Sequence, residues 1–451
     1  MRGQVILRCM TLRLGIPFIL ALAVTASMRT AGQSTTTDVA FQKFWTAKSP
    51  AEATKTTGDL LKSGVTFDEA VRRLKQGRTY VSQKSGVIMQ SNKENATQHF
   101  YAVNVPENYD PSRRYQVRFQ LHGGVDGRRT NEPRGSGEIG ALAGAEQFYV
   151  LPYSWNASPW WSKDQVLNLG AIVDALKRTY NIDENRVVVA GVSDGATGAY
   201  YIGMHETTPF ASFLPLNGFI MVLGSNGIDD GNLFPNNLRN KPWFVVNGGL
   251  DRLYPTSAVE PFTNHLKNSG VEIDYHPEPD GQHNTAWWPW MKAPFEKFVS
   301  DHPRNPDPDT LTWETADLSL NRAHWLVIDK LGAQPNDAKE LPDANAINSF
   351  AMTRFAATTS SLFDRSKPSG RVDLVRKGNT VEATTKGVLS FTLLLSPDKF
   401  DFTKPVKVVG NGRTVFEGRV EKSLETLLKW AARDNDRTML YGAELKINLS
   451  R

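Results

Sequence analysis

The chain of 451 residues contains only one cysteine, Cys9. This residue lies in an N-terminal stretch that has the features of an export signal, so a processed chain would contain no cysteine. Such a chain can form no disulfide and cannot use a thiol as its nucleophile. A zinc site built on cysteine ligands is excluded for the same reason.

Acidic residues are absent from residues 1–32, which carry Arg2, Arg8, Arg13 and Arg29. Removing these four positive charges from the net charge of +5 leaves +1. The basic character therefore belongs to the leader. The rest of the chain has no stripe of basic residues, so no nucleic-acid partner is expected.

The leader is typical of a secretory signal peptide. Its arginines precede an apolar run from Leu14 to Ala23, and small residues then lead to a cleavage point near Ser27. We expect residues 1–26 to be removed and the protein to be secreted or periplasmic. The alternative is an uncleaved anchor, but the run is shorter than the roughly 20 residues that a membrane-spanning helix needs. No later run is long and apolar enough to span a membrane, so no stable membrane insertion is expected after processing.

The composition and length indicate a folded protein of two or three domains, with 40% hydrophobic residues and 11 tryptophans. Residues 27–84 carry helical patterns, and residues 85–303 alternate strand patterns with helical ones. Three prolines within residues 302–310 predict a linker over residues 304–310. Residues 311–451 carry the short strand patterns of a mostly β accessory domain.

The strand patterns between residues 85 and 303 predict a particular architecture. Five runs carry strand patterns: Tyr115–Leu121, Arg186–Gly191, Leu214–Met221, Trp243–Asn247 and Val271–His276. Among them, Arg186–Gly191 is fully apolar and of the kind that is buried on both faces. Helical stretches lie between them, such as Gln165–Tyr180. This alternation predicts an α/β fold with a mainly parallel central sheet flanked by helices.

Residues 191–195, Gly-Val-Ser-Asp-Gly, match the G-x-S-x-G pattern of a nucleophile elbow. The pattern requires small residues two positions before and after the serine, because the serine lies on a sharp strand-to-helix turn. Here it follows the most apolar predicted strand, and a predicted helix over Ala196–Met204 comes next. Ser193 is therefore the candidate nucleophile. The alternative is an ordinary glycine-bounded turn.

A serine nucleophile needs a histidine base, which in proteins with this elbow comes after the acid in the chain. His283 lies in a loop just past the predicted strand Val271–His276, so its side chain is expected at the carboxyl edge of the sheet. The other histidines that follow Asp251 lie in less suitable places: His265, His276, His302 and His324.

The candidate acid is Asp251, which follows the predicted strand Trp243–Asn247. In this position it would hold the imidazole tautomer and stabilise the imidazolium. The alternative is that Asp251 only caps the turn before Pro255. Asp229 and Asp230, in an earlier loop, are the rival acids.

The developing oxyanion needs two hydrogen-bond donors. One candidate is the backbone amide of Asp194, directly after the nucleophile. The others are the amides of Gly124 and Val125, in the glycine-rich loop that follows the strand Tyr115–Leu121. His122, which opens this loop, is expected to have a structural role.

These pieces resemble the α/β-hydrolase superfamily. The resemblance covers residues 85–303 and rests on four ordered pieces: His122-Gly123-Gly124, Gly191–Gly195, Asp251 and His283. Within the superfamily, the chain is most similar to secreted esterases and polyhydroxyalkanoate-depolymerase-like proteins, and it also approaches the prolyl-oligopeptidase-type serine hydrolases. The resemblance implies a central sheet of about eight strands and acyl-enzyme chemistry that needs no metal or cofactor. It implies nothing about residues 311–451.

Tryptophans cluster in two loops that follow predicted strands. We expect Trp160, Trp161, Trp287 and Trp288 to bind substrate, because large rigid rings suit stacking on aromatic rings or sugars. The alternative is that these rings pack the rim of the sheet and its helices.

We therefore expect a secreted serine hydrolase that cleaves carboxylic esters through an acyl-enzyme on Ser193, with a triad completed by Asp251 and His283. The expected partner is an ester substrate of polymeric or aromatic kind, and the sequence does not predict the oligomeric state. Two alternatives stay open: a serine peptidase of prolyl-oligopeptidase type, and a catalytically inactive binding protein on the same fold.

Overall fold

The computed structural model describes residues 35–125, 139–332, 342–348 and 359–449. The predicted signal peptide over residues 1–26 lies outside these ranges. Within them, no helix combines the length and the apolar character that crossing a bilayer requires.

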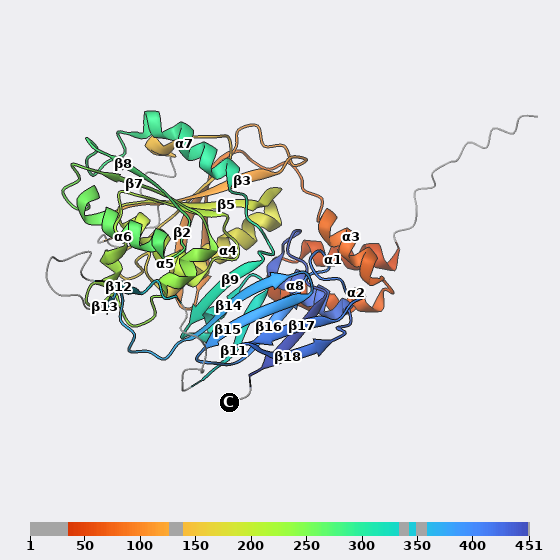
Figure 1. Ribbon diagram of the computed structural model, residues 1–451. Helices are drawn as coiled ribbons and strands as arrows, with labels where there is room; N and C mark the ends of the chain where they lie inside the picture. The colour runs from red at the N-terminus through yellow and green to blue at the C-terminus, as the bar shows by residue number, and fades with distance from the viewer. Residues whose placement is uncertain (1–34, 126–138, 333–341, 349–358, 450–451) are drawn as a thin grey trace, which may run out of the picture.

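Eight strands of the described chain form a central sheet: β1 (Gly86–Glu94), β2 (Thr97–Val105), β3 (Tyr115–Leu121), β4 (Phe148–Pro152), β5 (Ile182–Val192), β6 (Ser212–Leu216), β7 (Trp243–Gly248) and β8 (Ile273–Glu278). Their order in the sheet is β1-β2-β4-β3-β5-β6-β7-β8. Figure 1 shows this sheet, with labels on β2, β3, β5, β7 and β8. The six strands β4-β3-β5-β6-β7-β8, in sheet order, pair in parallel. At one edge, β2 pairs antiparallel with β4, and β1 pairs antiparallel with β2. The prediction of an α/β fold with a mainly parallel sheet is confirmed.

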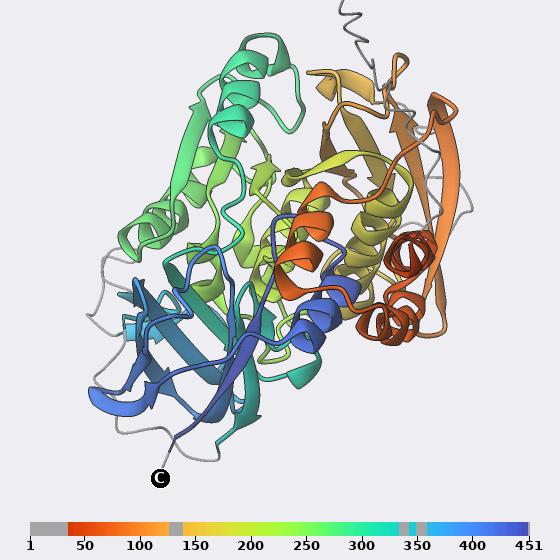
Figure 2. The same cartoon turned by 90° about the vertical axis from the view of Figure 1, so that its right-hand side faces the viewer.

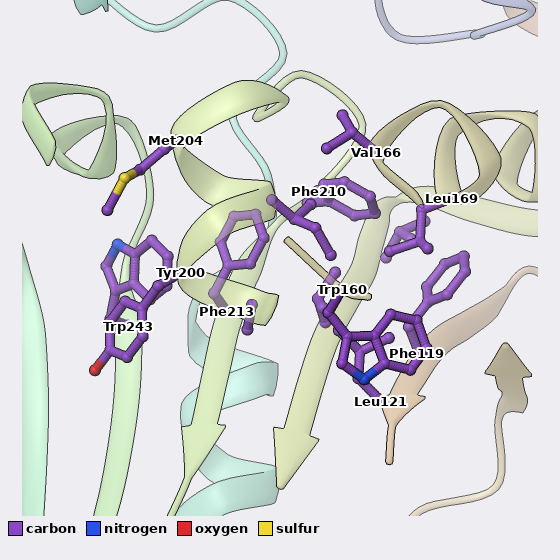
Figure 3. Close-up of a cluster of buried hydrophobic side chains, with 14 of the residues drawn as sticks. Phe119, Leu121, Trp160, Val166, Leu169, Tyr200, Met204, Phe210, Phe213 and Trp243 are labelled. Atoms are coloured by element: carbon purple, nitrogen blue, oxygen red, sulfur yellow. The ribbon is translucent and has the colours of Figure 1, made fainter. Parts of the chain in front are cut away.

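Helices cover both faces of this sheet: α4 (Lys163–Thr179), α5 (Asp194–His205), α6 (Thr256–Asn268) and α7 (Trp288–Asp301). The first three contribute side chains to the core on one face, and α7 packs on the other. Neighbouring residues of β6 and β7 divide accordingly, with Phe213 and Trp243 in the first core and Leu214 and Phe244 in the second. In the first core the Trp243 ring stacks on Phe213 and on Tyr200, with centroids 4.7 and 5.1 Å apart (Figure 3).

The predicted strand Leu214–Met221 is too long, because β6 ends at Leu216. The next residue, Asn217, has a φ of 49°, a left-handed conformation that ends the extended backbone. The apolar residues after it form a short 3-10 helix, η2 (Ile220–Gly224), at the carboxyl end of the strand.

The region after residue 309 is mostly β, as predicted. One sheet has the order β10-β11-β16-β19 and another the order β18-β17-β15-β14-β9, and their side chains share one core. A separate strand pair and one helix accompany them. The elements are β9 (Thr310–Thr315), η4 (Leu318–Leu320), β10 (Arg322–Ala323), β11 (Leu326–Leu331), β12 (Ala346–Asn348), β13 (Thr359–Ser361), β14 (Gly370–Lys377), β15 (Thr380–Lys386), β16 (Val388–Leu395), β17 (Val406–Gly410), β18 (Arg413–Gly418), α8 (Leu424–Asp434) and β19 (Ala443–Asn448).

Three N-terminal helices pack against α8: α1 (Thr36–Thr46), α2 (Pro50–Lys62) and α3 (Phe67–Gln76). Figure 2 shows them beside the blue α8 helix. Phe41, Phe44 and Leu60 share a buried cluster with Leu427 and Leu428 of α8. The N-terminal helices are therefore anchored to α8, near the C-terminal end of the chain.

The predicted linker over residues 304–310 is not an exposed tether. Arg304 is only 3% exposed, and its guanidinium contacts Asp436 Oδ2 at 2.9 Å. Lys177 of α4 contacts the same carboxylate at 3.1 Å. A buried charge network thus joins the sheet region to the C-terminal region. The prolines of this segment interrupt regular secondary structure, but they do not prevent its burial.

Candidate active site

Ser193 lies at the junction of β5 and α5, with φ 57° and ψ −118°. Such a conformation in a non-glycine residue costs about 1–3 kcal/mol and persists only where the surroundings enforce it. A Cβ at Gly191 would lie 2.0 Å from the Gly195 carbonyl oxygen, and one at Gly195 would lie 2.1 Å from the Leu121 oxygen. Both glycines are therefore required for this turn, which presents a half-buried serine above the sheet.

The structure brings together the three residues of the predicted triad. His283 Nε2 lies 2.9 Å from Ser193 Oγ, and His283 Nδ1 lies 2.7 Å from Asp251 Oδ2. The carboxylate cannot donate when ionised, so Nδ1 carries the proton and Nε2 accepts from the serine hydroxyl. This arrangement can withdraw the proton from Ser193.

Asp251 is held by the turn that follows β7. Its Oδ1 atom accepts hydrogen bonds from the amides of Leu253 and Tyr254, at 2.8 and 3.0 Å, which leaves Oδ2 for His283. The residue is only 2% exposed. Backbone donors and burial therefore fix the carboxylate and, through it, the imidazole.

The rival acids serve another purpose. Asp229 Oδ2 accepts a hydrogen bond from the Asp364 amide at 2.7 Å, and Asp230 forms an ion pair with Lys367 at 2.8 Å. Both carboxylates therefore fix the C-terminal region to the loop after β6.

The glycine-rich loop after β3 lies directly against Ser193. A Cβ at Gly123 would lie 2.9 Å from Ser193 Cβ, and Gly124 has a φ of 67°, which favours glycine. Neither the Gly124 amide nor the Asp194 amide donates a hydrogen bond to another described residue. Both amides are therefore candidate oxyanion donors.

The expectation for Val125 is contradicted. Its amide donates to Asp194 Oδ2 at 2.9 Å and is therefore already engaged. The predicted structural role of His122 agrees with its contacts, because Nε2 accepts from the Ser154 amide at 3.0 Å and Nδ1 lies 2.9 Å from the Gly123 oxygen. The loop is thus fixed on both sides of Gly123 and Gly124, by His122 before them and Val125 after them.

Sequence reasoning missed Asn217, a fully buried residue directly after β6. Its side-chain amide donates to the Asn284 carbonyl at 2.7 Å, directly after His283 in the chain. Its backbone amide donates to Val246 of β7 at the same distance. The side chain therefore braces the histidine loop. Its positive φ does not single it out, because Asn95, Asn411 and Asn435 share this conformation.

Three of the four predicted substrate-binding tryptophans are buried. Trp160, Trp287 and Trp288 are 0%, 1% and 6% exposed, and only Trp161 is half-buried. The Trp160 ring lies within the first core (Figure 3), with its Nε1 atom donating to the His122 oxygen at 2.8 Å. These contacts favour the packing alternative for the three buried rings, because a substrate cannot stack on a ring with no open face.

Among the described residues, no three or more His, Cys, Asp or Glu side chains are grouped so as to hold a metal ion.

The sheet order and the serine elbow define the class of the protein: the chain has the α/β-hydrolase fold, and the predicted resemblance to that superfamily is confirmed. No protein-family model matches the chain. The chain is 28% identical to the probable feruloyl esterase C of Aspergillus terreus over 189 residues, which are 38% of this chain and 67% of that protein.

Two solved structures are similar to this chain over about half its length. A thermostable esterase has a TM-score of 0.38 and 20% identity, and the match covers 48% of this chain and 63% of that one. A ferulic acid esterase has a TM-score of 0.37 and 19% identity, with 49% and 99% of the two chains covered. The chain thus spans less than two thirds of the thermostable esterase.

Proposed function

We propose that this protein is a serine hydrolase that cleaves carboxylic esters through an acyl-enzyme on Ser193. The observation that carries the proposal is the continuous series of hydrogen bonds from Asp251 through His283 to Ser193, at 2.7 and 2.9 Å. The likeness to a probable feruloyl esterase supports the ester as substrate class.

In the proposed first step, the Ser193 hydroxyl attacks the ester carbonyl while His283 Nε2 takes its proton. The tetrahedral intermediate then expels the alcohol, which receives this proton, and the acyl group stays on Ser193. In the second step a water molecule gives a proton to His283 and attacks the acyl carbon. Ser193 recovers its proton as the carboxylic acid leaves.

The proposed oxyanion donors are the amides of Asp194 and Gly124. Their lack of hydrogen-bond partners among the described residues supports this assignment, as does the close approach of Gly123 to Ser193. Donors fixed by the backbone need no reorganisation when negative charge develops, so they stabilise the transition state more than the ground state.

The proposal includes export, which rests on the leader sequence of residues 1–26. The substrate would then be an ester met outside the cytoplasm. Detection of a mature N-terminus near Ser27 in an expressing cell's exported fraction would test this part.

The decisive experiment combines a fluorophosphonate probe with a substrate panel. We expect the probe to label the wild-type protein but not Ser193→Ala, and p-nitrophenyl esters to be cleaved faster than peptide anilides. Cleavage of anilides alone would favour a peptidase. A folded protein with neither labelling nor turnover would be a binding protein. Loss of the nucleophile should lower kcat by about 10⁶-fold.

A further inference from the structure

An aromatic wall lies beside the triad histidine; it consists of Phe219, Tyr254 and Phe262. The ring centroids of Tyr254 and His283 are 5.6 Å apart in an edge-to-face contact. Phe219 continues the row, 6.2 Å from Tyr254 and 5.3 Å from Phe262 of α6. All three rings are half-buried, so each keeps part of its surface open.

The wall borders the active site and continues into apolar surface. Leu250 and Leu253, on either side of Asp251, are 59% and 61% exposed. Burial raises the pKa of the Tyr254 hydroxyl, and the nearby carboxylates of Asp194 and Asp251 raise it further. Apolar surface next to a reactive serine is suited to an apolar part of a substrate.

The chemistry of His283 determines on which side of the site the alcohol part of the ester lies. In acyl transfer the leaving oxygen receives its proton from Nε2, so it must lie within hydrogen-bond reach of that atom. The alcohol part of an ester therefore begins beside His283, on which Tyr254 packs.

The loop that carries Phe219 is covered by a C-terminal arm, which we define as residues 342–348 and 359–367. The arm contains β12 and β13, which pair antiparallel. Its side chains Ile347, Leu362 and Phe363 are at most 7% exposed and belong to the core of the sheet region, together with Ile220 and Leu223 of η2. A Cβ at Gly224 of η2 would lie 3.7 Å from Phe363 Cδ1, so the arm packs on the 3-10 helix that follows Phe219.

Polar contacts fix the arm at several points. The Asp364 amide donates to Asp229, and Lys367 pairs with Asp230, both on the loop after η2. His265 of α6, three residues after Phe262, has its Nε2 atom 2.9 Å from the Ala344 carbonyl oxygen. The arm therefore holds both the loop that carries Phe219 and the helix that carries Phe262.

We propose that the aromatic wall binds the alcohol part of the ester and that the C-terminal arm positions this wall, so the C-terminal region helps to set substrate specificity. This inference rests on the proposed function. The three rings contact the substrate, whereas the arm acts through them. Loss of the arm's packing should loosen the wall and leave the hydrogen bonds of the triad intact.

The test compares ethyl acetate with 2-phenylethyl acetate, which share the acyl group and differ in the size of the alcohol. Phe219→Ala should lower kcat/KM for 2-phenylethyl acetate about fivefold relative to ethyl acetate, mainly through KM. Phe363→Ala should shift the same ratio in the same direction, although Phe363 does not touch the substrate. If Phe363→Ala does not fold, Phe363→Leu takes its place.

The matched control is Phe400→Ala, which removes a ring of similar burial from the core of the C-terminal sheets. It should lose stability to a similar extent and leave the ratio unchanged. Equal ratios in wild type, Phe219→Ala and the Phe363 variant would overturn the inference while wild-type turnover and probe labelling still supported an esterase. A shift of the ratio in the Phe400→Ala control as large as that in the Phe363 variant would also overturn it. Absence of labelling and turnover in the wild type would remove the proposed function and the inference together.

Discussion

The Val125 amide donates a hydrogen bond to the Asp194 carboxylate, with 2.9 Å between nitrogen and oxygen. This contact joins the glycine-rich loop after β3 to the residue that follows the proposed nucleophile, Ser193. It removes one expected oxyanion donor but orients the loop, because Gly124 directly precedes Val125. The two amides proposed for the oxyanion thus belong to backbone segments that one side chain links.

Removing this link should slow turnover. We expect Asp194→Ala to lower kcat for a short ester about 10–100-fold with little change in KM, since a misplaced donor weakens transition-state binding in particular. Asp194→Asn is the matched control, because its amide oxygen can still accept from Val125 and should preserve most of the rate. Steady-state kinetics of both variants, with circular dichroism to establish folding, would decide. Full activity in Asp194→Ala would remove the role given to the link.

Replacing the triad acid should affect turnover more than substrate binding. Asp251→Asn can donate to His283 and so favours the wrong imidazole tautomer, for which a loss of about 10⁴ in kcat is expected. Asp230→Asn is the comparison, since Asp230 pairs with Lys367 at the surface and should be close to neutral. The reverse ranking of the two variants would move the acid to the earlier loop.

The buried tryptophans should behave as core residues. Trp288→Ala opens a cavity between α7 and the sheet, and a loss of about 3–5 kcal/mol in unfolding free energy is typical of such a change. Short and bulky esters should then be affected alike. Trp161→Ala, at the half-buried ring, tests the remaining part of the stacking hypothesis. A selective loss on bulky esters in Trp288→Ala would restore the substrate-binding role.

Asp307, in the predicted linker over residues 304–310, should make the free energy of unfolding depend on pH. Asp307 is 3% exposed, and burial raises the pKa of its carboxyl to about 7. A raised folded-state pKa means that the folded protein retains a proton that the unfolded chain has lost, so stability falls as pH rises from about 4 to about 7. Asp307→Asn lacks this titration and should gain up to about 4 kcal/mol over wild type at pH 8.

Urea unfolding of both proteins at pH 5 and pH 8 would measure the effect. The difference between variant and wild type should be larger at pH 8. Parallel pH profiles would show that Asp307 does not titrate between these values.

The sequence was most informative where local pattern and chain order determine position. Ser193, Asp251 and His283 each follow a recognisable strand, and parallel strands bring their carboxyl ends to one edge. The engagement of Val125, the burial of Trp287 and the brace at Asn217 depend on partners that are distant in the chain. No local pattern reports which donor an amide finds after folding, or which face of a loop becomes covered.

The length of β6 and the character of residues 304–310 illustrate the same limit. An apolar run after Leu216 looks like continued strand until the positive φ of Asn217 ends it. Three prolines predict a break in regular structure, and that break is present, but whether such a segment is buried depends on the residues that surround Arg304.

The charge network around Arg304 has a consequence for modularity. Arg304 and Lys177 share the Asp436 carboxylate, and all three side chains are at most 7% exposed. Separating the two regions would strand cations or an anion in sites built to exclude water, a loss of several kcal/mol. We therefore expect a single calorimetric transition, and neither half should be exchangeable between proteins like a detachable binding module. The C-terminal region and the sheet region should therefore fold as one cooperative unit.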